Sequence, residues 1–320
     1  MTVKKRPKSL SHGRPPILSK HNDLSRSLTS KATRTLIRTH HRLQKQRAAA
    51  LRAGDNARAT ELSKAIDSNG GLELYQAASI KGQSAERGGD SSRVLVQWLK
   101  ERGTFTSGQS TRSDFTESNR EVTGNRKEKI KEPFQLKVLE VGALSPLNAI
   151  SGLPGLNITC IDLHSQHPTI ETQDFMERPI PNSDEEKFDI ISLSLVLNYV
   201  PNAVARGEML RRTCKFLRLG KQSEEAEENL TIPALFLVLP APCVMNSRYL
   251  TEEHLALIMD TLGFVLMHKK LSAKLVYYLW RYQSGGMQKP VPKKSLRAGG
   301  SRNNFCVVLE WKKLKPREKV

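Results

Sequence analysis

The stretch from Leu136 to Asp162 constrains the fold of this chain more than any other part of its sequence. A first apolar run over 136–141 ends at Gly142, and a second over 158–161 ends at Asp162. Short apolar runs bounded in this way are typical of buried strands in a parallel sheet. A glycine lets the backbone approach a ligand closely, and an acid about twenty residues later can bind ribose hydroxyls. The stretch therefore predicts a site for a ligand that contains adenosine.

Apolar runs and helical segments alternate from this stretch onward, which predicts an α/β fold with a mostly parallel sheet. We expect the C-terminal strand, Phe305 to Trp311, to pair antiparallel with the strand that begins at Gly263. Leu275 to Tyr282 fits either a strand or a helix. The other expected elements are strands at 136–141, 157–162, 170–173, 188–194 and 234–239, and helices at 203–219 and 251–262.

The segments before this sheet differ from it in composition. Residues 1–26 are rich in Lys, Arg, Ser and Pro and are expected to be disordered. Residues 27–106 contain four helical patterns, and the polar stretch 107–131 is typical of a linker. Residues 132–320 then form the ligand-binding domain, in which 283–302 is a Gly-, Pro- and Lys-rich insertion that we expect to be exposed.

The net charge of +19 indicates a polyanionic partner. Residues 1–60 hold 15 Lys or Arg and 2 acids. The first predicted helix, from Ser27 to about Ala53, has an apolar stripe through Leu36, Leu43 and Ala50. Basic side chains cover the rest of this helix, so it is either a solvated amphipathic helix or a rail for an RNA backbone, and the charge excess favours the rail.

Several other classes of protein are disfavoured. The longest apolar run, 235–245, is broken by two prolines and is too short to span a bilayer. The N-terminus lacks the apolar core of a secretory signal. The four cysteines are far apart, without the paired spacing of a zinc or redox site, so no metal is expected.

The turn after the first strand discriminates between two adenosine ligands. A dinucleotide site needs three glycines, so that a pyrophosphate can lie on a helix N-terminus. Here Gly142 is the only glycine in the turn, and Leu144, Ser145 and Pro146 follow it. S-adenosylmethionine (SAM) has no phosphate, so the turn favours SAM over NAD.

Further candidate residues lie at the ends of the later strands, where open α/β sheets bind ligands. Asp162 would bind the ribose hydroxyls, and Asp174 the adenine amino group, with the Phe175 ring packed on the adenine. In the loop after the fourth strand, Asn198 can hydrogen-bond a base edge and Tyr199 offers a face for stacking. The candidate cofactor-binding residues are Gly142, Asp162, Glu140, Asp174 and Phe175, and the candidate catalytic residues are Asn198 and Tyr199.

Five short motifs carry a family resemblance. GALSP follows Leu139-Glu140-Val141, and Cys160-Ile161-Asp162-Leu163 and Gln173-Asp174-Phe175-Met176 come next. Phe188-Asp189 then precedes LVLNYVP at 195–201. Together they resemble the fungal nucleolar methyltransferases that form N1-methyladenosine in large-subunit (25S) rRNA. The resemblance spans about 70–310, which includes the upstream Gly70-Gly71 and YQAAS at 75–79.

The resemblance implies a Rossmann-like class I methyltransferase fold with a seven-stranded sheet. It also implies SAM contacts at Gly142 and Asp162, large-subunit rRNA or a pre-ribosome as partner, and a nuclear, nucleolar location. Metazoan relatives of this family look like SAM sensors that bind the cofactor and protein partners without methylating RNA, and the resemblance therefore implies an alternative function. The charge of +19 favours the enzyme, because a sensor has little need for phosphate contacts.

Overall fold

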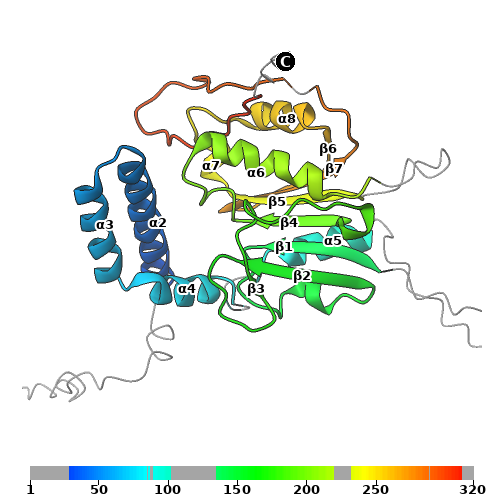
Figure 1. Cartoon of the computed structure of the whole chain (residues 1–320), viewed down its shortest axis with the longest axis horizontal. Coiled ribbons are helices and arrows are strands. Elements are labelled where there is room, and N and C mark those ends of the chain that lie inside the picture. Colours follow the sequence, from blue (N-terminus) through cyan, green and yellow to red (C-terminus); the bar gives the residue numbers. More distant parts are fainter. Residues whose placement is uncertain are drawn as a thin grey trace, which may run out of the picture. The chain divides into compact units, whose positions relative to one another are not determined.

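The computed structural model describes residues 29–84, 86, 89–101, 135–219, 232–287 and 289–311 (Figure 1). The chain divides into two compact units, Met1–Gly82 and Gln83–Val320, each of which is described by itself. The expected disordered tail 1–26 and the expected linker 107–131 lie outside the described residues.

The first unit contains three helices, α2 (Ser30–Arg52), α3 (Asn56–Ser68) and α4 (Gly71–Gly82). Thr29 caps α2, because its side chain accepts a hydrogen bond from the Ala32 amide at 3.2 Å. The apolar stripe of α2 packs against α3 as its heptad spacing predicts, through Leu43, Ala50, Leu62 and Ile66. The basic side chains of α2 lie outside this small core.

Two histidines of α2 are used for packing. The His40 ring stacks on Tyr75 with a centroid distance of 4.4 Å, and His41 meets the same ring edge-on at 5.1 Å. Burial, with His40 and Lys45 nearby, lowers the pKa of His41 to about 3. Both histidines therefore stabilise the helix packing, and the described residues contain no cluster of three potential metal ligands.

The second unit is built on a seven-stranded sheet with the order β3-β2-β1-β4-β5-β7-β6. The first five strands along the chain are parallel, whereas β7 is antiparallel to both β5 and β6. This order, with one antiparallel strand next to β5, is that of the Rossmann-like class I methyltransferases, and the predicted fold class is confirmed. The strands are β1 (Leu136–Val141), β2 (Leu156–Asp162), β3 (Glu171–Thr172), β4 (Ile190–Ser194), β5 (Ala234–Pro240), β6 (Phe264–Leu271) and β7 (Leu275–Tyr282).

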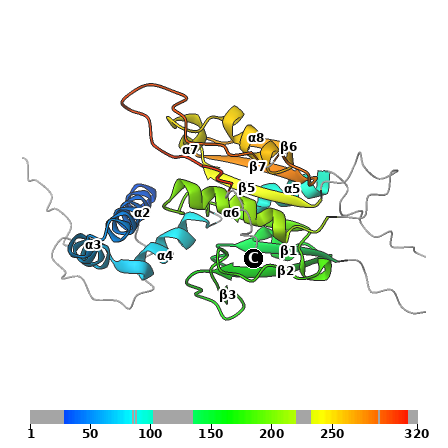
Figure 2. The ribbon, with the colours of Figure 1, turned by 45° about the horizontal axis from the view of Figure 1, so that its top comes forward.

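Helices cover both faces of the sheet (Figure 2). On one face, α6 (Ala203–Phe216) and α8 (Glu252–Thr261) bury their apolar sides against β1, β4 and β5. On the other face, α5 (Ser92–Glu101) packs through Leu95, Trp98 and Leu99. The remaining short helices are η3 (Ala149–Gly152), η4 (Asp184–Glu186) and α7 (Pro242–Met245). Among the described helices none is long and apolar enough to cross a membrane.

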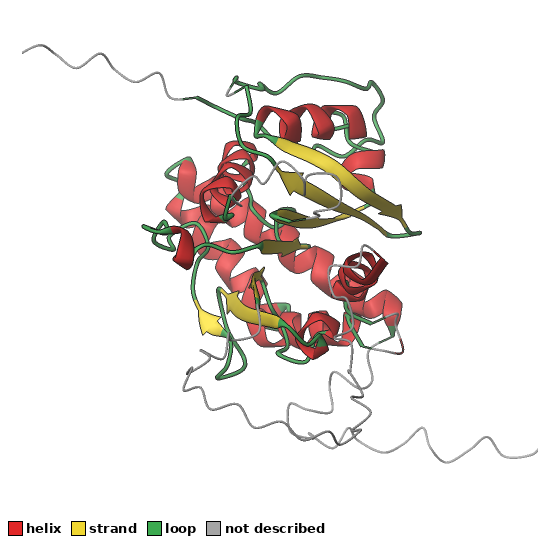
Figure 3. Ribbon diagram, turned by 90° about the vertical axis from the view of Figure 1, so that its right-hand side faces the viewer, coloured by secondary structure: helices red, strands yellow, loops and turns green. Residues whose placement is uncertain are grey.

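Two predictions about element placement are wrong. We expected α5 to belong to the helical region 27–106, but its apolar stripe is buried on the sheet, so the boundary between the units lies at Gly82. We also expected Phe305–Trp311 to be the last strand, but β7 pairs with β6 in its place. The segment is apolar because it packs on α6: a Cβ on Gly207 would lie 1.9 Å from the Val308 carbonyl oxygen. The strands of the sheet are coloured yellow in Figure 3.

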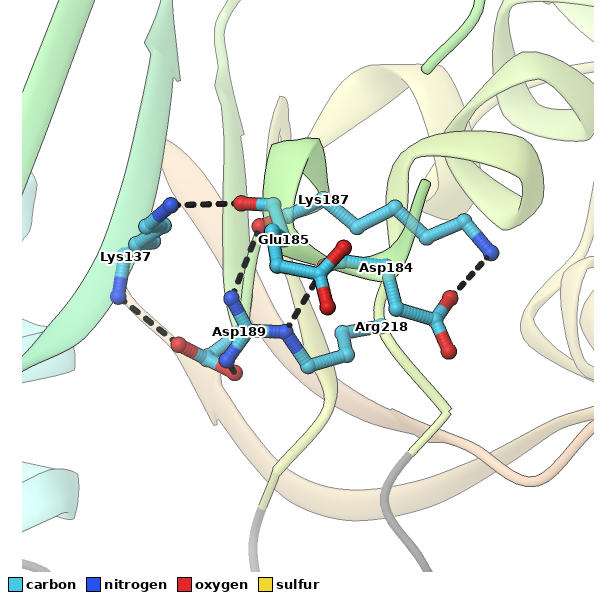
Figure 4. Close-up of polar contacts among 6 residues, drawn as sticks. All are labelled: Lys137, Asp184, Glu185, Lys187, Asp189 and Arg218. Atoms are coloured by element: carbon cyan, nitrogen blue, oxygen red, sulfur yellow. Dashed lines mark hydrogen bonds and ion pairs between the residues drawn. The ribbon is translucent and has the colours of Figure 1, made fainter. Parts of the chain in front are cut away.

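A polar network closes the sheet at the amino end of its parallel strands (Figure 4). Asp189 accepts hydrogen bonds from the Lys137 amide at 2.8 Å and from Arg218 Nη1 at 3.2 Å. Arg218 also donates to the carbonyls of Asp184 and Lys187, and Lys187 pairs with the Asp184 carboxylate at 2.7 Å. Each cation in this network has a carboxylate or a carbonyl beside it, so the network serves the fold.

Candidate active site

Gly142 and Asp162 lie side by side at the carboxyl ends of β1 and β2. Val141 is in register with Ile161, and the Gly142 amide donates to the Ile161 carbonyl at 2.8 Å. Gly142 has a φ of +76°, and a Cβ at this position would lie 2.6 Å from Cγ2 of Val196. The turn after β1 thus touches the loop after β4, and only glycine fits there without strain.

The Asp162 carboxylate is half-buried at the end of β2. Its Oδ1 accepts a hydrogen bond from the His164 amide at 2.8 Å, which fixes the turn after the strand. Burial raises the pKa of Asp162, and the His164 hydrogen bond opposes that rise. A partly desolvated carboxylate of this kind suits the binding of ribose hydroxyls.

Glu140 is buried in β1, two residues before Gly142, with 7% of its surface exposed. Asn148 Nδ2 donates to Glu140 Oε1 at 2.6 Å, and the Cys160 thiol lies 3.8 Å from Oε2. Burial raises the pKa of Glu140 to about 7, an effect to which the Asp90 carboxylate adds and which the Asn148 amide opposes. A buried carboxylate poised near neutral pH is typical of a functional site.

Asp174 and Phe175 follow β3. Asp174 Oδ1 accepts from the Met176 amide at 2.7 Å, so the side chain also shapes a turn. We expected the Phe175 ring to pack on a bound adenine, but the ring is 2% exposed and packs on Phe216 at 5.2 Å. Arg212 lies over the same ring at 5.8 Å, so the ring contributes to the core in this structure, and its packing on an adenine stays a prediction.

The loop after β4 holds Asn198 and Tyr199 next to the turn of Gly142. Leu195 has a φ of +59°, a conformation that is rare for a residue with a branched side chain and that clusters at functional sites. Asn198 is 9% exposed, and Tyr199 is half-buried. Buried Arg206 fixes the end of the loop through hydrogen bonds to the carbonyls of Val200 and Pro201.

A further segment at this edge of the sheet was missed by the sequence analysis. Ser91 Oγ lies 2.5 Å from Ser194 Oγ at the end of β4, and Ser92 Oγ accepts from the Ile150 amide at 3.0 Å. Asp90 Oδ2 accepts from the Ala149 amide at 3.2 Å. The helical pattern in this part of the sequence gives no information about a partner more than fifty residues away.

These residues fit SAM. The backbone at Gly142 leaves no room for a side chain, and Asp162 lies beside it for a ribose. Glu140 and Asp90 supply two carboxylates at the same edge, the chemistry that an ammonium group needs. The site therefore matches a ligand that carries a ribose and a positive charge, as SAM does.

Comparisons with known proteins relate this chain to rRNA methyltransferases. The sequence model of the Bmt2 family, described as 25S rRNA (adenine(2142)-N(1))-methyltransferase, matches residues 60–307. A Schizosaccharomyces pombe protein named 25S rRNA adenine-N(1) methyltransferase is 36% identical over 276 residues, which cover 85% of this chain and 89% of that protein. A Saccharomyces cerevisiae protein named 25S rRNA (adenine(2142)-N(1))-methyltransferase is 35% identical over 247 residues, 76% of this chain and 61% of that protein.

Solved structures resemble the chain only distantly. The 16S rRNA methylase RmtB is 14% identical with a TM-score of 0.33, covering 80% of this chain and 76% of RmtB. The N-terminal domain of EvdMO1 with SAH bound is 12% identical with a TM-score of 0.31, covering 46% of this chain and 75% of that domain. The fold assignment accordingly rests on the strand order of the sheet.

Proposed function

The chain belongs to the Bmt2 family of 25S rRNA (adenine-N1) methyltransferases. On this premise we propose which of its residues bind the cofactor and which bind the target adenine. It is a SAM-dependent rRNA methyltransferase. In our proposal, the turns after β1 and β2 hold the cofactor, and the loop after β4 holds the target adenine. The observation that carries the proposal is the contact between Gly142 and Val196, which joins the two turns into one site.

Four carboxylates would bind the cofactor. Asp162 accepts hydrogen bonds from the ribose hydroxyls. Asp174 accepts a hydrogen bond from the adenine amino group through Oδ2, because its Oδ1 already accepts from the Met176 amide. Glu140, held by Asn148, and Asp90 face the ammonium of the methionine part. SAM supplies, when it is bound, an electrophilic methyl group on its sulfonium. Because both the ammonium and the sulfonium are cationic, a carboxylate-lined site favours them electrostatically.

The loop after β4 would position the adenine. Adenine N1 has a lone pair in the ring plane once the base is unpaired, so the chain need not provide a strong base. Its contribution is to hold N1 in line and to exclude water. Asn198 is suited to bind the base edge, and Tyr199 to stack on the ring, which offsets the few kcal/mol that unpairing costs. Arg206 fixes this loop from behind by its bonds to Val200 and Pro201.

The substrate also bears on where the chain works. A protein that modifies 25S rRNA acts in the nucleus. We propose the nucleolus as its compartment and a pre-ribosomal particle as the form in which it meets the RNA. The basic cluster Lys4-Lys5-Arg6-Pro7-Lys8 supports this proposal, because such clusters serve nuclear import or phosphate contact.

The test is methyl transfer to a defined transcript. The purified full chain is incubated with SAM carrying a labelled methyl group and with 25S rRNA fragments that tile the molecule. Digestion to nucleosides should place the label in 1-methyladenosine. Because this modification blocks the Watson–Crick edge, reverse transcription of the product should stop at one position.

Two results would contradict the proposal. Label in a different nucleoside would show that the adenine is bound through another edge. Tight SAM binding without transfer to any fragment, or to pre-ribosomal particles, would favour the sensor function instead.

A further inference from the structure

The C-terminal strap, residues 289–309, combines a high positive charge with an absence of acids. No Asp or Glu occurs in the sequence between Thr261 and Leu309. Lys289, Lys293 and Lys294 are exposed within the described part of the strap. A segment whose charged side chains are all positive creates a local positive electrostatic potential.

The strap lies along the segment that follows β5. Arg297 Nη1 donates to the carbonyls of Val244 and Met245, at 2.9 and 2.8 Å. The Leu296 amide donates to the Arg248 carbonyl at 2.9 Å. Since α7 begins two residues after β5 ends, these bonds hold the strap at the carboxyl edge of the sheet, which is the edge of the candidate active site.

The strap is also joined to the loop that would hold the adenine. Buried Arg206 donates to the Cys306 carbonyl at 2.6 Å, and the same guanidinium binds the carbonyls of Val200 and Pro201. Its guanidinium lies 4.6 Å over the Phe305 ring. One side chain therefore connects the strap to the end of the loop that carries Asn198 and Tyr199.

The cations of the strap have few negative partners. Lys293 Nζ lies 4.2 Å from the centre of the Tyr249 ring, which positions the ammonium without neutralising it. No strap cation forms an ion pair among the residues that the structure describes. Of the acids at the start of α8, Glu252 pairs with Lys269 at 2.7 Å. The pKa of Glu253 is lowered mainly by a hydrogen bond from the Thr251 side chain and to a smaller extent by the charges of Arg297 in the strap and of Lys269, so the strap lysines are left without an acid beside them in the described part of the chain.

We infer that the strap is a docking surface for the phosphate backbone of the substrate RNA, next to the target adenine. The inference rests on the proposed function and adds to it the element that presents the RNA to the loop after β4. It differs from the assignment of RNA binding to the basic helix α2. Lysines that neutralise phosphates release counterions, so their loss should lower both the affinity and its dependence on salt.

The test uses the full chain with Lys293→Ala and Lys294→Ala together. The matched control replaces Lys100 and Lys215, two exposed lysines at the far ends of α5 and α6, near the amino edge of the sheet. The probe is the 25S rRNA fragment that the unchanged protein methylates. RNA affinity is measured between about 50 and about 200 mM salt, and SAM affinity is measured by calorimetry.

The expected result is a loss of RNA affinity of about tenfold in the strap variant, with a salt slope lower by between about 1 and 2. Its SAM affinity should stay unchanged, and the control should bind RNA as the unchanged protein does. Unchanged RNA affinity in the strap variant, or an equal loss in the control, would overturn the inference. Failure of the proposed function is separate, since it would appear as missing 1-methyladenosine in the unchanged protein.

Discussion

The two edges of the parallel sheet use charge in opposite ways. At the amino edge, Asp189, Lys137 and Arg218 satisfy one another and the neighbouring carbonyls (Figure 4). At the carboxyl edge, acids gather around Gly142, and cations gather on the strap. The first arrangement is neutral and closed, whereas the second keeps its charges available for a ligand.

The difference shows which edge serves stability and which serves function. Charges that are paired within the protein stabilise the fold only if they stay paired. Charges that have no oppositely charged partner inside the protein cost stability unless a ligand compensates them, and for that reason they mark a site. Substitutions at the amino edge should therefore change unfolding, and those at the carboxyl edge should change binding.

The largest expected effect is on stability, from Asp189→Ala. The substitution leaves the Lys137 amide and the Arg218 guanidinium without their acceptor, so the free energy of unfolding should fall by about 3 kcal/mol. SAM affinity, measured where the variant is still folded, should not change. Denaturant unfolding measures the first quantity and calorimetry the second. The exposed Asp184, changed to Ala, is the matched control and should alter little.

The next effect is on methyl transfer, from Gly142→Ala. The added Cβ would meet Val196 at 2.6 Å in a backbone conformation that L-residues rarely adopt. The turn after β1 must shift to relieve this contact. Because a misplacement of about 1 Å can cost about a hundredfold in rate, methyl transfer should fall by about a hundredfold. Combining it with Val196→Ala removes the clash but not the backbone strain, so part of the activity should return. If the single variant kept full activity, the contact between the two turns would not matter for the site.

The smallest effect is a pH dependence that involves Glu140. Because its folded pKa is about 7, above the ordinary value of 4.5, the folded protein holds an extra proton between these values. Ionised Glu140 is needed to bind a cation, so SAM affinity should rise by up to about tenfold from pH 6 to pH 8. Over the range from about 4.5 to 7 the same group makes stability fall as pH rises. Glu140→Gln should remove both slopes, and a variant that kept them would assign the titration to another group.

The sequence predicted the sheet well where the signal was local. The strands β1 and β2 and the glycine and acid at their ends follow from short apolar runs and the residues that bound them. Parallel pairing then brings Gly142 next to Asp162, because both strands end at one edge. This part of the site could be predicted because the register of a parallel sheet is set by its apolar runs.

The rest depended on tertiary contacts that a sequence pattern does not reveal. Phe305–Trp311 is apolar enough for a strand, but its apolar side chains are used against α6, where Gly207 allows a close approach. Phe175 looked like a ligand contact because of its place after β3, but its ring fills the core beside Phe216. Asp90, Ser91 and Ser92 reach the site from the start of α5 and the two residues before it, in a region that the sequence analysis assigned to another domain.

The most direct test of the account is SAM affinity and methyl transfer in Asp162→Asn and Asp162→Ala. Asparagine can keep the hydrogen bond from the His164 amide, so the turn after β2 is retained while the charge is lost. Alanine removes both. The account predicts a loss of SAM affinity of about tenfold for Asn and about thirtyfold or more for Ala, with transfer falling in parallel. Unchanged SAM affinity in both variants would contradict the account, because the cofactor would then be bound elsewhere than at the carboxyl ends of β1 and β2.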